Sequence, residues 1–227
     1  MVKIVFTPDW FLGKDILVEF FSFIVLAIFS VLAIKGYKLK GNKGLLHLGF
    51  GFGFIAVARL VSVFTKLILY YDAEPVQAFG KAIMTSQVVS SIDIFYYAGF
   101  FSYYFLTLVG LFIIYKIPQK RLLFSGDYVL VLYFIALVSL FSKEFFYLFH
   151  VTAFLMLILI IINYLMVYRE NKFMNTRILI ISFSILALSQ LVYILSKIGV
   201  FFALSNIMEL ISYTILLFLI IRIIKHG

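Results

Sequence analysis

The chain contains no cysteine and only three prolines among its 227 residues. The missing cysteine excludes disulfides, thiol nucleophiles, iron–sulfur clusters and thiolate metal sites. The prolines, Pro8, Pro75 and Pro118, all lie outside the long apolar runs. Broken membrane helices are common in transporters, so the absence of proline from the apolar runs weighs against that class of protein.

Sequence patterns of enzymes are also missing. The three histidines, His47, His150 and His226, have no acidic residue at metal-ligand spacing, and no paired carboxylates, Ser-His-Asp order or phosphate-binding loop is evident. The last apolar run has no central lysine to form a Schiff base with retinal. We therefore expect no enzyme and no metal or cofactor site.

Charge is scarce as well, because only 13% of the residues are charged and 65% are hydrophobic. Soluble domains are about half apolar and about a quarter charged, and a membrane helix needs about 20 mainly apolar residues. The sequence therefore predicts an all-α integral membrane protein, a single seven-helix domain over residues 1–227. The spans are predicted near residues 16–35, 45–70, 92–116, 127–143, 145–168, 177–198 and 201–224.

The 19 Lys and Arg residues predict how these spans are oriented. Four basic clusters follow alternate apolar runs, and the other connections carry few basic residues: Lys35, Lys38, Lys40 and Lys43; Lys116, Lys120 and Arg121; Arg169, Lys172 and Arg177; Arg222 and Lys225. Because cytoplasmic loops hold the excess of Lys and Arg, the prediction is a cell-membrane protein with its N-terminus outside and its C-terminus in the cytoplasm. The net charge of +9 is then a match for anionic membrane lipids rather than for nucleic acid.

One outer connection, residues 71–91, is long enough to hold structure of its own. Pro75 suits the first turn of a helix, and Val76, Phe79, Ile83 and Met84 then lie on one side of it. The segment is either a short amphipathic helix on the outer surface or a partly ordered loop.

Two of the predicted spans resemble each other. Residues 51–66 align without a gap over residues 182–197, with identities at Phe52/Phe183, Ala56/Ala187, Leu60/Leu191, Val61/Val192 and Lys66/Lys197. Both segments run from the inside to the outside, so a duplication would be parallel, with three spans, a linking fourth and three more. Chance matching of two apolar helices remains the alternative.

Arg59 and Glu209 are the clearest candidates for a functional site, since an ionisable group inside the hydrocarbon costs several kcal/mol unless it is paired. They lie about 16 Å and about 12 Å below the outer ends of their predicted helices at 1.5 Å per residue, so we expect an ion pair. Polar stripes on the second, sixth and seventh spans, together with Asp93 on the third, make up the predicted ligand site or polar network: Arg59, Ser62, Asp93, Ser189, Gln190, Tyr193, Asn206, Glu209 and Tyr213. Polar residues concentrate in the outer half, and the pattern predicts an outward-facing polar pocket above an aliphatic inner half.

Two further patterns each have a plain interpretation. Gly49, Gly51 and Gly53 favour close packing of the second span inside the bundle over dimerisation. The aromatic run around Tyr96 and Tyr103 is either an interfacial belt or the lining of a pocket for a lipid tail or a flat apolar ligand.

Three functions stay open at this point. The first is a sensor or binding module that takes a small or lipidic ligand from the outer side and signals to a membrane or cytoplasmic partner. The second is a small-solute transporter with parallel repeats. The third is a structural subunit of a membrane complex.

Overall fold

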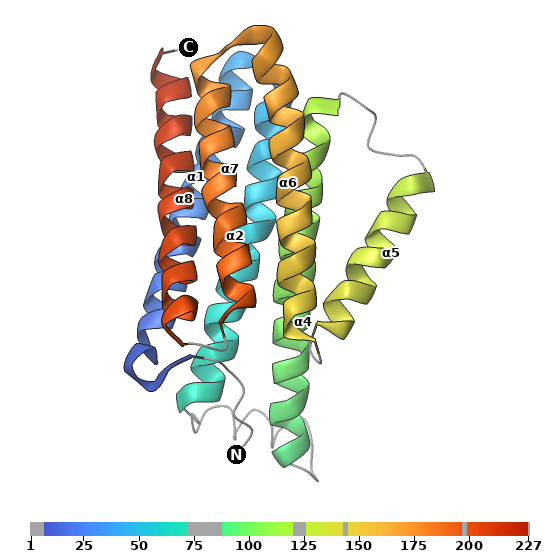
Figure 1. Ribbon diagram of the computed structural model, residues 1–227, viewed down its shortest axis with the longest axis vertical. Helices are drawn as coiled ribbons and strands as arrows, with labels where there is room; N and C mark the ends of the chain where they lie inside the picture. The colour runs from blue at the N-terminus through green and yellow to red at the C-terminus, as the bar shows by residue number, and fades with distance from the viewer. Residues whose placement is uncertain (1–6, 72–87, 120–125, 143–144, 197–198, 227) are drawn as a thin grey trace.

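The computed structural model describes residues 7–71, 88–119, 126–142, 145–196 and 199–226, and within them every regular element is a helix (Figure 1). The all-α prediction is therefore confirmed. The elements are η1 (Asp9–Phe11), α1 (Lys14–Lys40), α2 (Lys43–Tyr71), α4 (Val88–Lys116), η2 (Ile117–Gln119), α5 (Gly126–Phe141), α6 (Phe146–Asn171), α7 (Met174–Ile194) and α8 (Gly199–His226). Most of the predicted outer segment, residues 72–87, lies outside this description.

Six of the helices, all except α5, are long and apolar enough to cross a membrane. The predicted fourth span corresponds to α5, whose 16 residues fall short of the roughly 20 that a bilayer requires. In Figure 1, α5 leans away from the other helices at its Gly126 end, and it packs against α4 and α6. The bundle thus consists of six long helices with a shorter apolar one at its side.

The six long helices form two layers of three (Figure 1). One layer holds α1, α2 and α4 with α2 in the middle, and the other holds α6, α7 and α8 with α7 in the middle. Contacts of α1 with α8 and of α4 with α6 close the ring at both sides. Between the middle helices, the rings of Phe52 and Phe183 stack with centroids 6.2 Å apart.

Short connections of two residues make α2 antiparallel to α1 and α7 antiparallel to α6. After α1, Gly41 adopts a left-handed conformation with φ of 66°, and its N–H donates to the carbonyl of Tyr37 at 2.8 Å. Asn42 Oδ1 then accepts a 2.9 Å bond from the N–H of Gly44 at the start of α2. Lys172 ends α6 in the same way, with φ of 50°. A left-handed residue at this place satisfies a carbonyl of the last turn and stops the helix.

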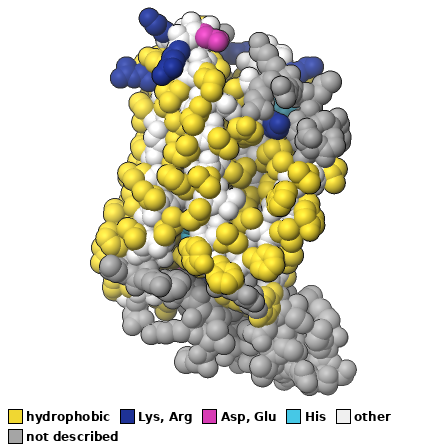
Figure 2. All heavy atoms as spheres, turned by 45° about the vertical axis from the view of Figure 1, so that its right-hand side comes forward, with side chains coloured by type: hydrophobic (Ala, Val, Ile, Leu, Met, Phe, Trp, Pro, Cys, Tyr) yellow, Lys and Arg dark blue, Asp and Glu magenta, His cyan; other side chains and the backbone are white. Residues whose placement is uncertain are grey.

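Most basic residues of the described chain gather at one end of the bundle, which we call the basic end; Lys14, Arg59 and Lys66 lie elsewhere. Figure 2 shows Lys and Arg side chains at the top of the molecule and hydrophobic side chains over the visible face below them. This is the end where α1, α4, α6 and α8 finish and where α2 and α7 begin. The clustering that the sequence predicts is thus present in space, and its members are Lys35, Lys38, Lys40, Lys43, Lys116, Arg169, Lys172, Arg177, Arg222 and Lys225.

The half of the bundle next to the basic end, called the apolar half, has an aliphatic and aromatic core. Its fully buried side chains include Leu26, Phe29, Phe52, Leu108, Ile114, Leu157, Ile160 and Leu216. Glycines allow the helices to approach closely there: a Cβ on Gly51 would lie 2.6 Å from Ile114 and 3.0 Å from the carbonyl oxygen of Gly110 in α4, and one on Gly49 would lie 3.2 Å from the carbonyl oxygen of Ser30 in α1. The prediction of internal packing by these glycines is confirmed.

Candidate functional site: a buried charged network

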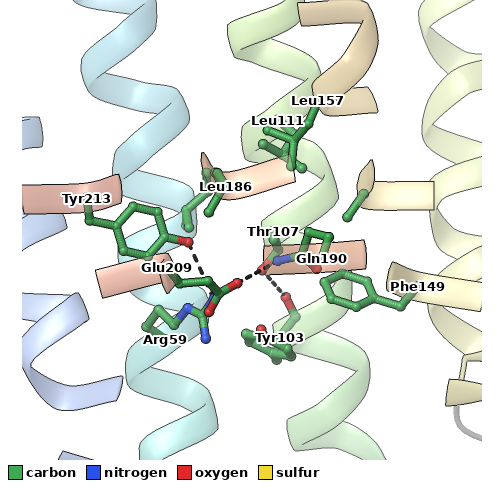
Figure 3. Close-up of a pocket in the computed structure, with 12 residues that line it drawn as sticks. Arg59, Tyr103, Thr107, Leu111, Phe149, Leu157, Leu186, Gln190, Glu209 and Tyr213 are labelled. Carbon is green, nitrogen blue, oxygen red and sulfur yellow. Dashed lines mark hydrogen bonds and ion pairs between the residues drawn. The ribbon is translucent and has the colours of Figure 1, made fainter. Parts of the chain in front are cut away.

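Arg59 of α2 and Glu209 of α8 join the two layers. A guanidinium nitrogen of Arg59 lies 2.5 Å from Glu209 Oε2, and the two side chains are 3% and 2% exposed. The same nitrogen lies 3.4 Å from the hydroxyl of Tyr213. Figure 3 shows Arg59, Glu209 and Tyr213 converging between the helices. The predicted ion pair between matched depths of α2 and α8 is present.

A hydrogen-bonded chain continues from Glu209 to α7 and α6. Gln190 Nε2 donates to Glu209 Oε1 at 2.6 Å. Gln190 Oε1 lies 2.8 Å from His150 Nδ1, and because an amide oxygen only accepts, the imidazole must donate from Nδ1. The ring of His150 stacks on that of Tyr193 at a centroid distance of 4.6 Å. Within the second layer, α7 therefore bonds the glutamate directly and α6 is linked to it through Gln190.

A second group of ion pairs lies between α1 and α2. Lys66 Nζ donates to Asp15 Oδ2 and to Glu19 Oε1, both at 2.8 Å. Asp15 and Glu19 are four residues apart, so they lie on one face of α1. Glu19 Oε1 also lies 3.9 Å from Arg59. Arg59 is therefore shared unequally between a near carboxylate in the second layer and a more distant one in the first.

Tyrosine rings complete the surroundings of Arg59. Its guanidinium carbon lies 5.3 Å from the ring centroid of Tyr103 and 5.9 Å from that of Tyr213, within range of cation–π attraction. Every long helix of the two layers thus contributes a side chain. We call this set the charged network, and it comprises Asp15, Glu19, Arg59, Lys66, Tyr103, His150, Gln190, Tyr193, Glu209 and Tyr213.

The charged network is enclosed rather than open. The free space beside Arg59 and Glu209 measures about 10 Å³, which is room for one water molecule. Three of its buried polar atoms, Glu19 Oε2, Arg59 Nε and His150 Nε2, have no hydrogen-bond partner among the residues described. The described residues around this ion pair therefore offer polar atoms for small rearrangements but no chamber for a larger molecule.

The structure brings together five of the residues that the sequence singles out: Arg59, Gln190, Tyr193, Glu209 and Tyr213. Ser189 and Asn206 are buried but bond to carbonyls of their own helices, those of Leu186 and Phe202. Ser62 is buried as well. Asp93 belongs to α4, but its side chain lies outside the described part of the molecule.

The predicted site omits half of the charged network: Asp15, Glu19, Lys66, His150 and Tyr103. The pattern contains a signal for three of them, since Lys66 continues the stripe of Arg59 after seven residues and Asp15 and Glu19 form an i, i+4 pair on the preceding helix. Nothing in the spacing of His150 or Tyr103 connects them to Arg59. Their place follows from which helices become neighbours.

Fold and site together define a multi-pass helical membrane protein with a charged interior. No protein-family model matches the chain, and no curated protein or solved structure matches it either. Among the described residues, no group of three or more acidic or histidine side chains is arranged to hold a metal ion. The function must accordingly be argued from the site itself.

Proposed function

We propose that the protein is a membrane binding module of the sensor type, in which the charged network is the element that changes state. One observation carries the proposal: the layers meet at an enclosed ion pair, Arg59 with Glu209, rather than at apolar side chains alone. Interhelical polar contacts in membranes stabilise by only about 0.6–2 kcal/mol. An ionised pair costs desolvation that apolar packing avoids, so its presence favours a functional role over a purely structural one.

The position of Arg59 between two carboxylates, Glu209 and Glu19, provides the two proposed states of the network. Its guanidinium lies 2.5 Å from Glu209 and 3.9 Å from Glu19. A shift of α2 of about 1–2 Å, which is typical of helix movements in switches, would make Glu19 the nearer carboxylate. The alternative partner of Glu19 is Lys66, at 2.8 Å. A ligand that favours one arrangement would shift the population of both layers.

The proposed orientation follows from the basic end. With Lys and Arg in the cytoplasm, the charged network lies in the outer half of the membrane, and the ligand, small or lipidic, arrives from the outer side or from the bilayer. The basic end then faces anionic headgroups and any cytoplasmic signalling partner.

A distance measurement between the layers tests the proposal. The chain has no native cysteine, so spin labels on Lys38→Cys in α1 and Arg177→Cys in α7, both exposed at the basic end, report only the engineered pair. If the network is a two-state element, Glu209→Gln shifts the distance distribution by about 1–2 Å or creates a second population. The matched control is Glu170→Gln at an exposed site. An unchanged distribution in a folded Glu209→Gln protein would reduce the network to a structural role.

The second candidate is a transporter with parallel repeats, favoured by how the two layers correspond. In each layer the middle helix packs against the other two, and the first helix of each layer contacts the third of the other. The aligned residues Phe52 and Phe183 stack, and the aligned residues Arg59 and Gln190 both contact Glu209. Uptake of glucose, alanine or lactate into proteoliposomes that is lost in Glu209→Gln would favour transport over sensing.

A further inference from the structure

A larger cavity lies on a different face of α2 from the charged network. It occupies about 330 Å³, which lies at the lower end of the range for small-molecule sites, about 300–1,000 Å³. We call it the α2–α4 groove, and its lining consists of Val61, Phe64, Thr65 and Ile68 from α2 and Tyr96, Ala98, Gly99 and Ser102 from α4. The groove is separate from the water-sized space beside Arg59.

A single glycine allows the two helices to approach beside the groove. A Cβ built on Gly99 would lie 2.1 Å from Thr65 Oγ1 and 2.7 Å from Thr65 Cγ2, so any side chain at position 99 would push Thr65 aside. Phe64 of α2 and Ala98 of α4 are exposed on the surface of the bundle. Because exposed side chains of spanning helices face lipid, a molecule dissolved in the bilayer reaches the groove from the side.

The chemistry of the lining defines what fits. Carbon atoms dominate it, no charged side chain belongs to it, and three hydroxyls are present, on Thr65, Tyr96 and Ser102. The Thr65 hydroxyl donates to the carbonyl of Val61 at 2.8 Å. The hydroxyls of Tyr96 and Ser102 make no hydrogen bond to any residue that the structure describes. A charged head group would be poorly solvated in such a lining, whereas one oxygen atom would find a partner.

We propose that the α2–α4 groove binds an uncharged, lipid-soluble molecule that carries a hydroxyl or carbonyl oxygen, such as a long-chain alcohol. The apolar body lies against Val61, Phe64 and Ile68, and the oxygen bonds to the hydroxyl of Ser102 or Tyr96. This ligand class deepens the proposed function, since it specifies the lipidic ligand that a sensor in the outer half would receive.

The groove is connected to the charged network through both of its helices. Thr65 lines the groove and its neighbour Lys66 bonds Asp15 and Glu19. Ser102 lines it too, and its neighbour Tyr103 lies over Arg59. An occupant that separates α2 from α4 therefore moves two members of the charged network together. The coupling of the groove to the charged network rests on the proposed function, whereas the binding of an alcohol in the groove does not.

Photolabelling tests the binding. The full chain in phosphatidylcholine nanodiscs is irradiated with a long-chain alcohol that carries a diazirine, and labelled positions are mapped by mass spectrometry. Label is expected on the groove residues, and an excess of unmodified alcohol should reduce it roughly tenfold or more. The variant Ser102→Trp fills the groove and should remove the competed label, whereas Ser184→Trp, on the exposed surface of α7, should retain it.

The labelling can also overturn the proposal. Label on the groove that excess alcohol does not reduce, or that equals the label on exposed Leu130 of α5, would mean ordinary contact with surrounding lipid. If Ser102→Trp does not fold, Ala98→Trp fills the same space from an exposed position and must give the same loss. Competed label without a change in the spin-label distances when alcohol is added would retain the groove as a binding site and would contradict the sensor function.

Discussion

The two halves of the bundle are built from the same six helices but are held together by different interactions. In the apolar half, glycine and aliphatic residues allow close backbone contact, as between Gly51 and Gly110. In the other half, which we call the polar half, charged side chains such as Arg59 and Glu209 join the layers. Close packing has one good arrangement, whereas a cation placed between two carboxylates has two. The apolar half therefore has one close-packed arrangement, and the polar half is where we propose that the bundle changes state.

Removing one partner of the central ion pair should break the polar half and give the largest effect. Glu209→Ala leaves Arg59 buried beside the more distant Glu19, and an uncompensated buried charge costs about 3–5 kcal/mol. The measurement is the free energy of reversible unfolding in mixed micelles. The matched control is Glu170→Ala at an exposed position, which should change stability by less than about 0.5 kcal/mol.

The double variant Arg59→Met with Glu209→Leu sharpens the same point. Replacing a buried ion pair by apolar residues of similar size is often neutral or stabilising, so the double variant should be more stable than Glu209→Ala. It should nevertheless lose any response of the spin-label distances. A double variant as unstable as the single one would contradict the view that the pair serves function rather than stability.

A side chain added between the glycines should disturb the apolar half to a smaller extent. A Cβ at Gly110 would lie 2.6 Å from the carbonyl oxygen of Gly51 and 2.7 Å from Ile55, so Gly110→Ala forces α2 and α4 apart. Overpacking of this kind costs about 1–3 kcal/mol. Gly36→Ala is the control, because its nearest neighbour is the side chain of Leu45 at 3.3 Å. The measurement is again the free energy of unfolding. If Gly110→Ala and Gly36→Ala lowered it equally, the close contact at Gly110 would have no special effect on stability.

The smallest effect is expected for a hydrogen bond between α7 and α8 near the middle of the second layer. Ser212 Oγ donates to the carbonyl of Ser182 at 2.8 Å, and such interhelical bonds contribute about 0.6 kcal/mol and at most about 1.7 kcal/mol. The free energy of unfolding of Ser212→Ala should be lower than that of the unmodified protein by an amount in this range. Ser184→Ala, which removes an exposed hydroxyl bonded within its own helix, should show no such decrease.

Long apolar runs and basic clusters were sufficient to predict the helices and the alternating direction in which they run. Hydrophobic length determines which segments can span a bilayer, and α1, α2, α4, α6, α7 and α8 confirm six of the predicted spans. The predicted fourth span, residues 127–143, corresponds to the apolar helix α5 (Gly126–Phe141), whose 16 residues are fewer than the roughly 20 that cross a bilayer. The pairing of Arg59 with Glu209 was predictable from depth alone, since antiparallel helices place residues at similar distances from their ends at one level.

It was harder to predict which residues become neighbours in space than how deep each residue lies in the membrane. His150 joins the charged network only because α6 packs against α7, and Glu19 does so because α1 packs against both α2 and α8. Helices of nearly uniform apolar composition carry little information about which of their faces meet. The enclosure of the ion pair in about 10 Å³ of free space likewise depends on the packing of all six helices.

The sequence by itself determined the class of protein, the positions of the apolar helices, their alternating direction and the matching depths of Arg59 and Glu209, because these follow from hydropathy and from the positions of charged residues along the chain. The tertiary structure alone decided that the helices form two layers of three, that Arg59 is shared between Glu209 and Glu19, and that the larger cavity lies between α2 and α4. The physical reason is that burial in a membrane is a local property of each segment. Partners and cavities depend on which side chains fit together when the segments pack.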